Sequence, residues 1–386
     1  MYGMIHRIEG EICKSTRPLW EEVFDEDSPK FTEYYFEHKA KENIGYVLGQ
    51  FPYKSMMFRT PYLLQIGEQR RMISYIVGVA TKKEWRHRGY MRKLLGYAFR
   101  EIYQEKEPFT FLMPANPAIY EPFGFRYVYE RTQWQLKDPK EDIFRLEALQ
   151  IKQIVEEELW QEQDKKGELK AAQIDEKWEV PKEGLYSVQN LCRQLPHYPV
   201  MEQLAAFANR YLRKQHHIYV CRDAAYYERQ LKESLAQNGD IYVLFQEGEI
   251  AAYFLYAKED DEIFLQEVIE EKEGILDFLQ QIPGKKPIIM ARIIHLQEMM
   301  KLICSEEKKS MIIEIEDELI PENEGIYSLE MTPKGSFVKQ ISSIQNEIPD
   351  RNKVESEKEL CIPEISMHIS QFTAWVLKGM FLNEIV

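Results

Sequence analysis

Residues 77–92 (VGVATKKEWRHRGYMR) have the types and spacing that bind a polyphosphate. Five basic side chains and one acidic side chain lie within residues 82–92, and Gly89 stands just before a helix-like segment. A helix N-terminus presents backbone N–H groups without intrahelical partners, together with the positive end of the helix dipole. Glycine also lets the backbone approach a bulky anion closely. The run therefore favours a binding site for a phosphate-bearing ligand; a solvated basic turn is the alternative.

The elements on either side of this run must hold it in place. Residues 73–80 (ISYIVGVA) are apolar and β-branched, which predicts a buried strand that leads into the basic turn. Residues 91–103 follow the pattern of an amphipathic helix, and residues 109–113 (FTFLM) predict the next strand. Strand, turn, helix and strand in this order are typical of an α/β fold. Further strands are predicted at 44–50 and 62–66, and a helix at 18–26.

The composition of the whole chain excludes several classes of protein. The chain has 386 residues and a formal net charge of −14, which argues against a protein that tracks the phosphates of nucleic acid. Its length predicts two or three domains. No apolar run reaches the roughly 18 residues of a membrane span, and the first residues lack the apolar core of a signal peptide. Five scattered cysteines form no zinc motif and fit reduced thiols. We therefore expect a cytoplasmic protein with no metal and no nucleic-acid or membrane partner.

Two further regions follow the first α/β unit. Residues 138–184 are rich in charge and favour a solvated helix and loop, with a domain boundary near Lys137. From about residue 287 the pattern becomes that of an α+β domain. The region between them predicts a second α/β unit, with helices at 201–215 and 223–237 and strands at 240–245, 250–256 and 262–266. The last region predicts strands at 311–316, 335–341 and 365–369 and a helix at 370–377.

Two motifs in the first unit resemble those of GNAT N-acetyltransferases. The run Arg86-His87-Arg88-Gly89-Tyr90-Met91 is similar to the family's pyrophosphate loop, Gln/Arg-x-x-Gly-x-Gly/Ala, with Met91 where glycine or alanine is usual. The segment before it is similar to the family's splayed fourth strand. Residues 111–125 (FLMPANPAIYEPFGF) resemble the helix and strand that close the acetyl-CoA site, with the family's tyrosine at Tyr120.

The resemblance extends over nearly the whole chain to the Eis (enhanced intracellular survival) family. Residues 291–294, 315–325, 368–375 and 381–386 are similar to that family's last domain. The resemblance implies an α/β and α+β fold class, in which tandem GNAT folds, each a mixed sheet flanked by helices, precede a sterol-carrier-protein-like α+β domain. It implies a catalytic GNAT domain at 1–137, a degenerate GNAT-like domain at 138–286 and the sterol-carrier-like domain at 287–386.

The resemblance also implies how the donor binds. Acetyl-CoA would be the co-substrate, with no metal. The backbone at the end of the fourth strand would hold the pantetheine arm and polarise the thioester carbonyl, the basic loop would hold the pyrophosphate, and two residues beyond the fifth strand would line the cofactor. The implied contacts are Val79, Ala80 and Thr81; Arg86, His87, Arg88, Gly89, Tyr90, Met91 and Arg92; and Ala115 and Asn116.

Two groups are implied to move protons. Tyr120 matches the family's general acid, and a phenol can protonate a departing thiolate of comparable basicity. The alternative is an aromatic residue that packs beside Phe123 and Phe125. The general base implied by the resemblance is the C-terminal carboxylate, on Val386. The apolar tail of residues 380–386 is compatible with that role, because burial raises the pKa of a carboxyl group; the alternative is a tail that only packs.

The acceptor site is the least specified part. Residues that match the family's acceptor pocket are aromatic and acidic, a combination that suits a cationic amine: Phe24, Asp25, Asp27, Tyr35 and Glu384. An acidic loop beside core aromatic residues is the alternative for each of them.

These observations predict an acetyl-CoA-dependent N-acetyltransferase. Its acceptors would be amines of the aminoglycoside, polyamine or lysine type, including lysine in a protein or peptide. The alternative from another class is a non-catalytic acyl-CoA sensor or lipid-binding module. The resemblance also implies a homo-oligomer, with a hexamer as one form.

Overall fold

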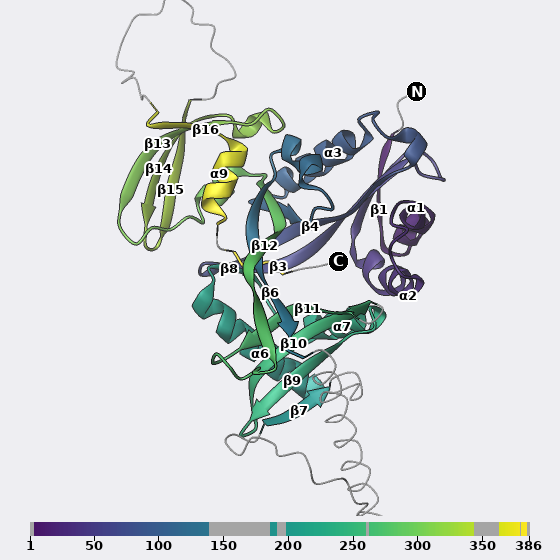
Figure 1. Ribbon diagram of the computed structural model, residues 1–386. Helices are drawn as coiled ribbons and strands as arrows, with labels where there is room; N and C mark the ends of the chain where they lie inside the picture. Colours follow the sequence, from purple (N-terminus) through teal and green to yellow (C-terminus); the bar gives the residue numbers. More distant parts are fainter. Residues whose placement is uncertain are drawn as a thin grey trace, which may run out of the picture. The chain divides into compact units, whose positions relative to one another are not determined.

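The computed structural model describes residues 4–138, 186–190, 198–259, 262–342, 363–378 and 380–383 (Figure 1). The chain divides into two compact units. The first unit contains Met1–Arg131, Gln215–Cys221 and Pro287–Val386, and the second contains Thr132–Lys214 and Arg222–Lys286. Each unit is described by itself. The segment at 138–184 that the sequence predicts as a solvated helix and loop lies, beyond Asp138, outside the described residues.

The first unit is built on one mixed sheet, which confirms the predicted α/β class. Its strands run in the order β1-β2-β3-β4-β5-β12-β6, and β8 pairs with β3. Neighbours from β1 to β4 are antiparallel, whereas β4 and β5 are parallel. The bounds are β1 (Ile5–Glu9), β2 (Ile44–Leu48), β3 (Ser55–Ile66), β4 (Gln69–Thr81), β5 (Phe109–Leu112), β6 (Arg126–Leu136), β8 (Ile218–Val220) and β12 (Leu279–Ile293).

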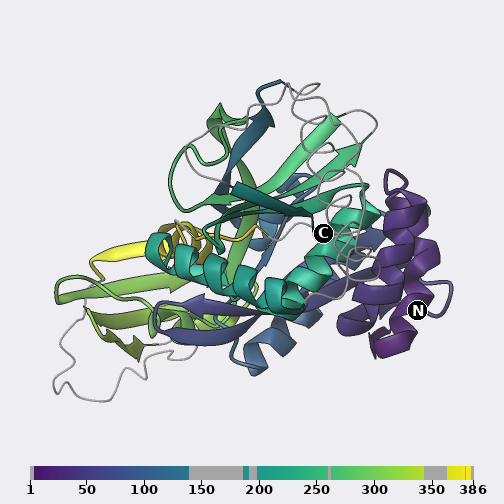
Figure 2. The ribbon, with the colours of Figure 1, turned by 90° about the horizontal axis from the view of Figure 1, so that it is seen from below.

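Helices of the first unit follow the amphipathic patterns of the sequence. The buried residues of α3 (Tyr90–Gln104), including Leu95, Phe99 and Ile102, recur every three or four positions and form one apolar face. The helix predicted at 18–26 is α1 (Arg17–Val23), which ends earlier because Phe24 leaves the helical conformation. The N-terminal helices form one group, drawn in purple (Figure 2). They are η1 (Gly10–Thr16), α1, α2 (Pro29–Tyr34), the π-helical turn η2 (Tyr35–Lys39) and η3 (Ala40–Glu42).

Strand β4 bends near its end and separates from β5. The recorded pairing between these parallel strands is a single residue pair, Tyr75 with Phe111. On its other side, β4 carries a bulge where it pairs with β3. Val77 lies opposite Phe58 and Ala80 lies opposite Met56, so β4 has one extra residue in this stretch. Gly78 in the bulge has φ +61°. Within the described chain, no residue of β4 beyond Tyr75 pairs with β5.

Strand β12 completes the sheet from far along the sequence. It is inserted between β5 and β6, and its residues Met290 to Ile293 pair antiparallel with β5. The side chains of Ile289, Met290 and Ile294 are fully buried. The segment from residue 287 thus shares a sheet and a compact unit with the segment predicted as the catalytic domain.

A second sheet of the first unit lies in the last hundred residues. Its order is β15-β14-β13-β16, with β16 parallel to β13. Alternate residues of β14 are buried, as expected for a sheet with one covered face. Its elements are β13 (Lys309–Glu316), β14 (Gly325–Thr332), β15 (Gly335–Ser342), β16 (Ile365–His368), α8 (Leu296–Met300), η7 (Pro321–Asn323) and α9 (Ile369–Val376).

The second unit is an antiparallel sheet with helices, as its sequence pattern predicts. The strand order is β11-β10-β9-β7, and a buried ion pair joins Arg222 to Glu267 at 3.0 Å. Among the described helices of both units, none is long and apolar enough to cross a membrane. The elements are β7 (Tyr186–Asn190), α6 (Tyr198–Gln215), α7 (Ala224–Ala236), β9 (Asp240–Gln246), β10 (Glu249–Glu259) and β11 (Glu262–Glu270).

The position of β12 predicts that residues 1–137 do not fold alone. Without β12, strand β5 loses its antiparallel partner and the core loses several large apolar side chains. Burying one large apolar side chain contributes about 2 kcal/mol to the free energy of unfolding, so five contribute on the order of 10 kcal/mol. This is comparable to the whole stability of a domain. The fragment should show no cooperative thermal transition by circular dichroism, whereas the full chain should. A sharp cooperative transition of the fragment would contradict this prediction.

Candidate active site

The end of β4 is held by side chains rather than by β5. Ser55 Oγ on β3 donates to the carbonyl of Ala80 at 2.8 Å and lies 2.8 Å from Thr81 Oγ1. Arg86 Nε donates to the carbonyl of Thr81 at 3.2 Å. Val79 and Thr81 are half-buried, whereas Ala80 is buried. These contacts fix the backbone of the predicted pantetheine segment on the side away from β5.

The basic loop leads into α3 through two left-handed residues. After η4 (Lys83–Trp85), His87 has φ +60° and Gly89 has φ +73°. Gly89 is the N-cap of α3, and within the described chain no side chain caps this helix. Arg86, His87, Arg88, Gly89 and Arg92 are exposed. The helix N-terminus therefore combines backbone N–H groups with exposed cations, as an anion site requires.

Trp85 organises this loop and was not singled out from the sequence. Its ring stacks on Tyr90 with centroids 6.1 Å apart, and the Lys54 ammonium and the Arg88 guanidinium lie 4.0 and 4.5 Å from its centroid. Arg88 also donates to the carbonyl of Glu84 at 3.2 Å. A large aromatic residue within a basic turn was the available signal, because cations gather over aromatic faces.

The departure at Met91 is explained by packing. Its side chain is half-buried and lies against the apolar core cluster that includes Leu94, Leu95 and Tyr120. The Met91 side chain thus packs in the core and does not occupy the loop. Of Gly89, Tyr90 and Met91, the last three positions compared, only Gly89 has a left-handed backbone conformation.

Tyr120 sits at the end of the short helix α4 (Pro117–Tyr120). Asn116 caps this helix by accepting a hydrogen bond from the Ala118 N–H at 3.0 Å, and Ala115 beside it is exposed. The Tyr120 ring meets Phe125 edge-on at 5.9 Å and is 9% exposed. Burial raises the pKa of its phenol to about 12. At neutral pH the hydroxyl is therefore protonated and can serve as a donor.

One apolar cluster brings these parts together. Tyr120 and Phe123 belong to it, and Val79, Tyr90 and Met91 pack against it. The Arg92 guanidinium lies 5.2 Å from the Phe123 ring centroid. The end of β4, the first turn of α3 and the turn that carries Tyr120 are thus adjacent, although about forty residues of sequence separate the first from the last.

The predicted acceptor residues of the α1–α2 connection surround Trp20. Phe24 contacts the Trp20 ring at 4.7 Å, and Asp27 Oδ2 accepts a hydrogen bond from Trp20 Nε1 at 2.7 Å. Burial raises the pKa of Asp27, and the hydrogen bond from Trp20 opposes that shift. Asp25 is exposed. The α1–α2 connection thus places carboxylates beside the aromatic rings of Trp20 and Phe24.

Tyr35 lies elsewhere than expected. It is fully buried, its ring stacks on Trp20 at 4.3 Å, and its hydroxyl accepts a hydrogen bond from Asn43 Nδ2 at 3.0 Å. A residue held on both sides in the core is not exposed to a substrate. The structure therefore corrects the expectation that Tyr35 walls the pocket: it supports Trp20 from behind.

Trp20 itself was missed by the sequence reasoning as a site residue. It is 3% exposed, and a Cβ on Gly78 would lie 2.6 Å from its ring. The indole thus fills the bulge of β4 while holding Asp27. Trp20 thereby links the α1–α2 connection to the end of β4. A tryptophan in an amphipathic helix gave no sequence signal that distinguishes this role from ordinary packing.

Two predicted residues, Glu384 and Val386, lie outside the described residues. The tail before them is packed: Leu382 is fully buried, and the Phe381 N–H donates to the carbonyl of Ile218 in β8 at 2.8 Å. The Phe381 ring lies 5.4 Å from that of Tyr129 in β6. The described tail therefore runs beside β8 and β6, the strand that follows the Tyr120 motif.

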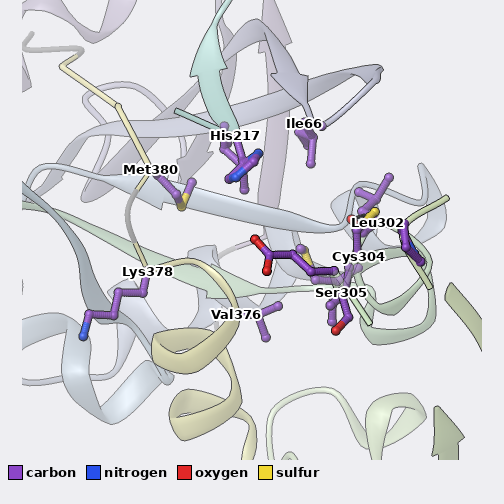
Figure 3. A pocket seen from close by; sticks show the side chains of 14 residues that line it. Ile66, His217, Leu302, Cys304, Ser305, Val376, Lys378 and Met380 are labelled. Carbon is purple, nitrogen blue, oxygen red and sulfur yellow. Dashed lines mark hydrogen bonds between the residues drawn. The ribbon is translucent and has the colours of Figure 1, made fainter. Parts of the chain in front are cut away.

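The first unit also contains an open cavity of about 390 Å³ (Figure 3). Its lining is mostly apolar and comes from the β3–β4 turn, β8, the segment after α8, the turn before β15 and the residues after α9. Figure 3 shows the Lys378 side chain directed away from the other labelled residues. None of the predicted acetyl-CoA or acceptor contacts is among its described lining residues. Among the described residues, no group of three His, Cys, Asp or Glu could hold a metal.

Comparison with known proteins identifies the chemistry of this unit. Residues 5–128 match the family model of the GNAT acetyltransferase domain. No curated protein matches the sequence. The match assigns acetyltransferase activity with an acyl-CoA donor to this part of the chain, and it confirms that the protein is a transferase enzyme.

Solved structures share the fold at low sequence identity. A conserved Enterococcus faecalis protein, assigned as a probable N-acyltransferase, has a TM-score of 0.69 at 14% identity, covering 98% of this chain and 90% of its own. A GCN5-related N-acetyltransferase from Anabaena variabilis has a TM-score of 0.63 at 11% identity, with 97% and 90% covered. Eis1 from Mycobacterium abscessus has a TM-score of 0.61 at 11% identity, with 97% and 89% covered.

The conformation of Gly89 predicts a specific effect on donor binding. Alanine at Gly89 disfavours φ +73° by about 1–2 kcal/mol, so the loop should relax and turn its N–H groups away from the pyrophosphate. We expect Gly89→Ala to weaken acetyl-CoA binding about tenfold, measured by titration calorimetry.

Gly96 provides a matched control in the same helix. It lies in the interior of α3 without a positive φ, and a Cβ there meets open space. Gly96→Ala should leave the affinity within about twofold and raise the thermal midpoint, because alanine stabilises a helix interior. Equal affinities of the two variants would contradict the role of Gly89.

Proposed function

We propose that the protein transfers the acetyl group of acetyl-CoA to the amine of a cationic acceptor. The observation that carries this proposal is the convergence of three parts on one apolar cluster: the splayed end of β4, the uncapped N-terminus of α3 and Tyr120. The GNAT match of residues 5–128 supports it.

The donor would lie along β4 and the N-terminus of α3. Backbone groups of Val79 to Thr81, which do not pair with β5, would bind the pantetheine arm and polarise the thioester. Residues 86–92 would hold the pyrophosphate with the helix N-terminus and the exposed cations. Ala115 and Asn116 would line the cofactor by their backbone, because the Asn116 side chain is engaged in capping α4.

Tyr120 would act as the general acid. The neutral amine attacks the thioester carbon, the C–S bond breaks, and the hydroxyl of Tyr120 gives its proton to the departing thiolate. The phenol of Tyr120 stays protonated over the whole physiological range, as a proton donor must. The proton released by the amine nitrogen would go to a general base.

The base would be the C-terminal carboxylate, on Val386. Support comes from the described tail: Met380 and Leu382 are buried, and Phe381 is bridged to β8 and packed on Tyr129. A tail anchored in this way can hold a carboxylate in a partly desolvated place, where its basicity increases.

The acceptor would bind beside Trp20. Phe24 offers an aromatic face, and Asp25 and Asp27 offer carboxylates within the same short connection. Glu384 would add a further charge. Carboxylates and aromatic rings recognise protonated amines, so acceptors of the polyamine, aminoglycoside or lysine type fit this composition.

The remaining expectations about organisation stay proposals. The second unit would be a degenerate GNAT-like domain, which its antiparallel meander β9–β10–β11 and helices α6 and α7 support. The region 287–386 would be a sterol-carrier-protein-like domain whose task is to deliver the chain's end. The protein would act as a cytoplasmic homo-oligomer.

A thiol-release assay tests the proposed function. Acetyl-CoA is incubated with a panel of polyamines, aminoglycosides and a lysine peptide, and free CoA is measured. At least one class should release CoA above the hydrolytic background, and Tyr120→Phe should lower kcat by about 10²-fold or more with little change in acetyl-CoA binding. Tight CoA binding without release by any amine would instead favour an acyl-CoA sensor.

The pH dependence tests the raised pKa of Tyr120. Because burial raises this pKa to about 12, the proton donor is lost only as pH rises through that value. The ratio of kcat for the native enzyme to kcat for Tyr120→Phe should therefore be large and constant between about pH 6 and 10. Tyr97→Phe, a half-buried tyrosine beside the same cluster, should keep full activity. A ratio near one would contradict the acid role, and a ratio that declines as pH rises towards about 10 would contradict the raised pKa.

Lengthening the chain tests the proposed base. Adding one alanine after Val386 moves the carboxylate by one residue and should lower kcat at least tenfold, while acetyl-CoA affinity stays within about twofold. The same residue added before Met1 serves as the control. Full activity of the C-terminally extended enzyme would show that the terminal carboxylate is not the base.

A further inference from the structure

A buried arginine on β12 reaches the turn that follows Tyr120. The Arg292 side chain is 1% exposed, and its Nη1 donates to the carbonyl of Phe123 at 3.1 Å. Phe123 ends the 3-10 turn η5 (Glu121–Phe123), which continues directly from α4. Carbonyls at the end of a helical segment lack intrahelical partners, so a guanidinium there satisfies one of them and complements the local dipole.

Gly124 makes this contact possible. It has φ +82°, and a Cβ at this position would clash with Arg292 Nη1. The glycine between Phe123 and Phe125 thus serves the reversal of the chain and admits the guanidinium against the turn. The guanidinium carbon also lies 5.1 Å from the Phe99 ring of α3.

The other end of the arginine is held rigidly. Asp317 is 1% exposed, and its two carboxylate oxygens accept hydrogen bonds from Arg292 Nη2 at 2.7 and 3.0 Å. The same carboxylate accepts from the backbone N–H groups of Leu319 and Ile320, each at 3.2 Å, and from Asn323 Nδ2 at 2.9 Å. Asp317 therefore fixes Arg292 to the connection between β13 and β14.

The other hydrogen bonds of the Tyr120 turn are local. The Gly124 N–H donates to the carbonyl of Glu121, and Arg126 donates to the carbonyls of Glu121 and Phe125. Such bonds can move together with the turn. Arg292, which is 169 residues away in sequence, instead ties the turn to the sheet and to a second segment of the fold.

We propose that Arg292 is a positioning residue for acetyl transfer. Held by Asp317, it fixes the Phe123–Gly124 turn and thereby the place of the Tyr120 hydroxyl. Burying an ion pair contributes little net stability compared with apolar residues of the same volume, so packing alone does not account for this arrangement. The inference deepens the proposed function and rests on the acid role of Tyr120.

A double-mutant cycle tests the inference. Lysine at position 292 keeps the charge but has a single nitrogen in place of the two that separately bond Phe123 and Asp317. Arg292→Lys should lower kcat about tenfold or more, since displacements of about 1 Å have such effects, with the KM for acetyl-CoA within about twofold. In the Tyr120→Phe background, the same substitution should cause no further loss, because both changes remove one function.

Arg59→Lys provides a matched control for lost stability. Arg59 is a buried arginine of the same unit that pairs with Glu105 and Glu107, and none of its described contacts is with the Tyr120 turn. Its substitution should lower the thermal midpoint as well, yet keep kcat within about twofold. Equal losses of kcat for Arg292→Lys in the two backgrounds, or no loss in either, would overturn the proposal.

A second measurement separates the inference from the proposed function. Amide hydrogen exchange of the peptide that spans residues 117–125 should be faster in Arg292→Lys than in Arg59→Lys, with or without turnover. Unchanged exchange would overturn the positioning role even in an active enzyme. If exchange is faster in Arg292→Lys but Tyr120→Phe is fully active, the acid role of Tyr120 is refuted. The role of Arg292 in holding the turn would still stand.

Discussion

The indole of Trp20 occupies the space in which a side chain at position 78 would begin. Only glycine fits there, and Gly78 takes a left-handed conformation that introduces a bulge into β4. The bulge lies beyond Tyr75, the residue of β4 that pairs with β5. The conformation of the end of β4 therefore depends on the close contact between Gly78 and Trp20, whose indole also holds Asp27.

On the side away from β4, β5 pairs with a strand from far along the sequence. β5 is a four-residue strand, and β12 pairs along all four of its residues. The same strand carries Arg292 to the Tyr120 turn. A parallel strand that has separated from one neighbour needs a firm partner on the other side. The catalytic sheet and the region from residue 287 thus form one unit because each completes the hydrogen bonding of the other.

Local patterns in the sequence were sufficient for the elements near the donor site. The apolar run that became β4, the amphipathic spacing of α3 and the glycine before it are properties of adjacent residues, and the structure has each of them. Contacts between distant residues left no such pattern. Nothing near Arg292 in the sequence points to Phe123. The sequence leaves open whether Tyr35 walls a pocket or packs in the core, and the structure encloses it between Trp20 and Asn43. Sequence reasoning therefore identified local elements and missed the contacts between distant residues that hold them.

Two helix N-termini, one in each unit, carry opposite charges. At the N-terminus of α3, Gly89 leaves the helix uncapped within the described chain, and exposed cations surround it. At the N-terminus of α7, the Asp223 carboxylate accepts a hydrogen bond from the Tyr226 N–H at 2.6 Å. The neighbouring Arg222 is buried and paired with Glu267. A phosphate approaching α7 would have to displace a carboxylate and would meet no exposed arginine at position 222. The N-terminus of α7 is therefore less suited to a polyphosphate than the N-terminus of α3.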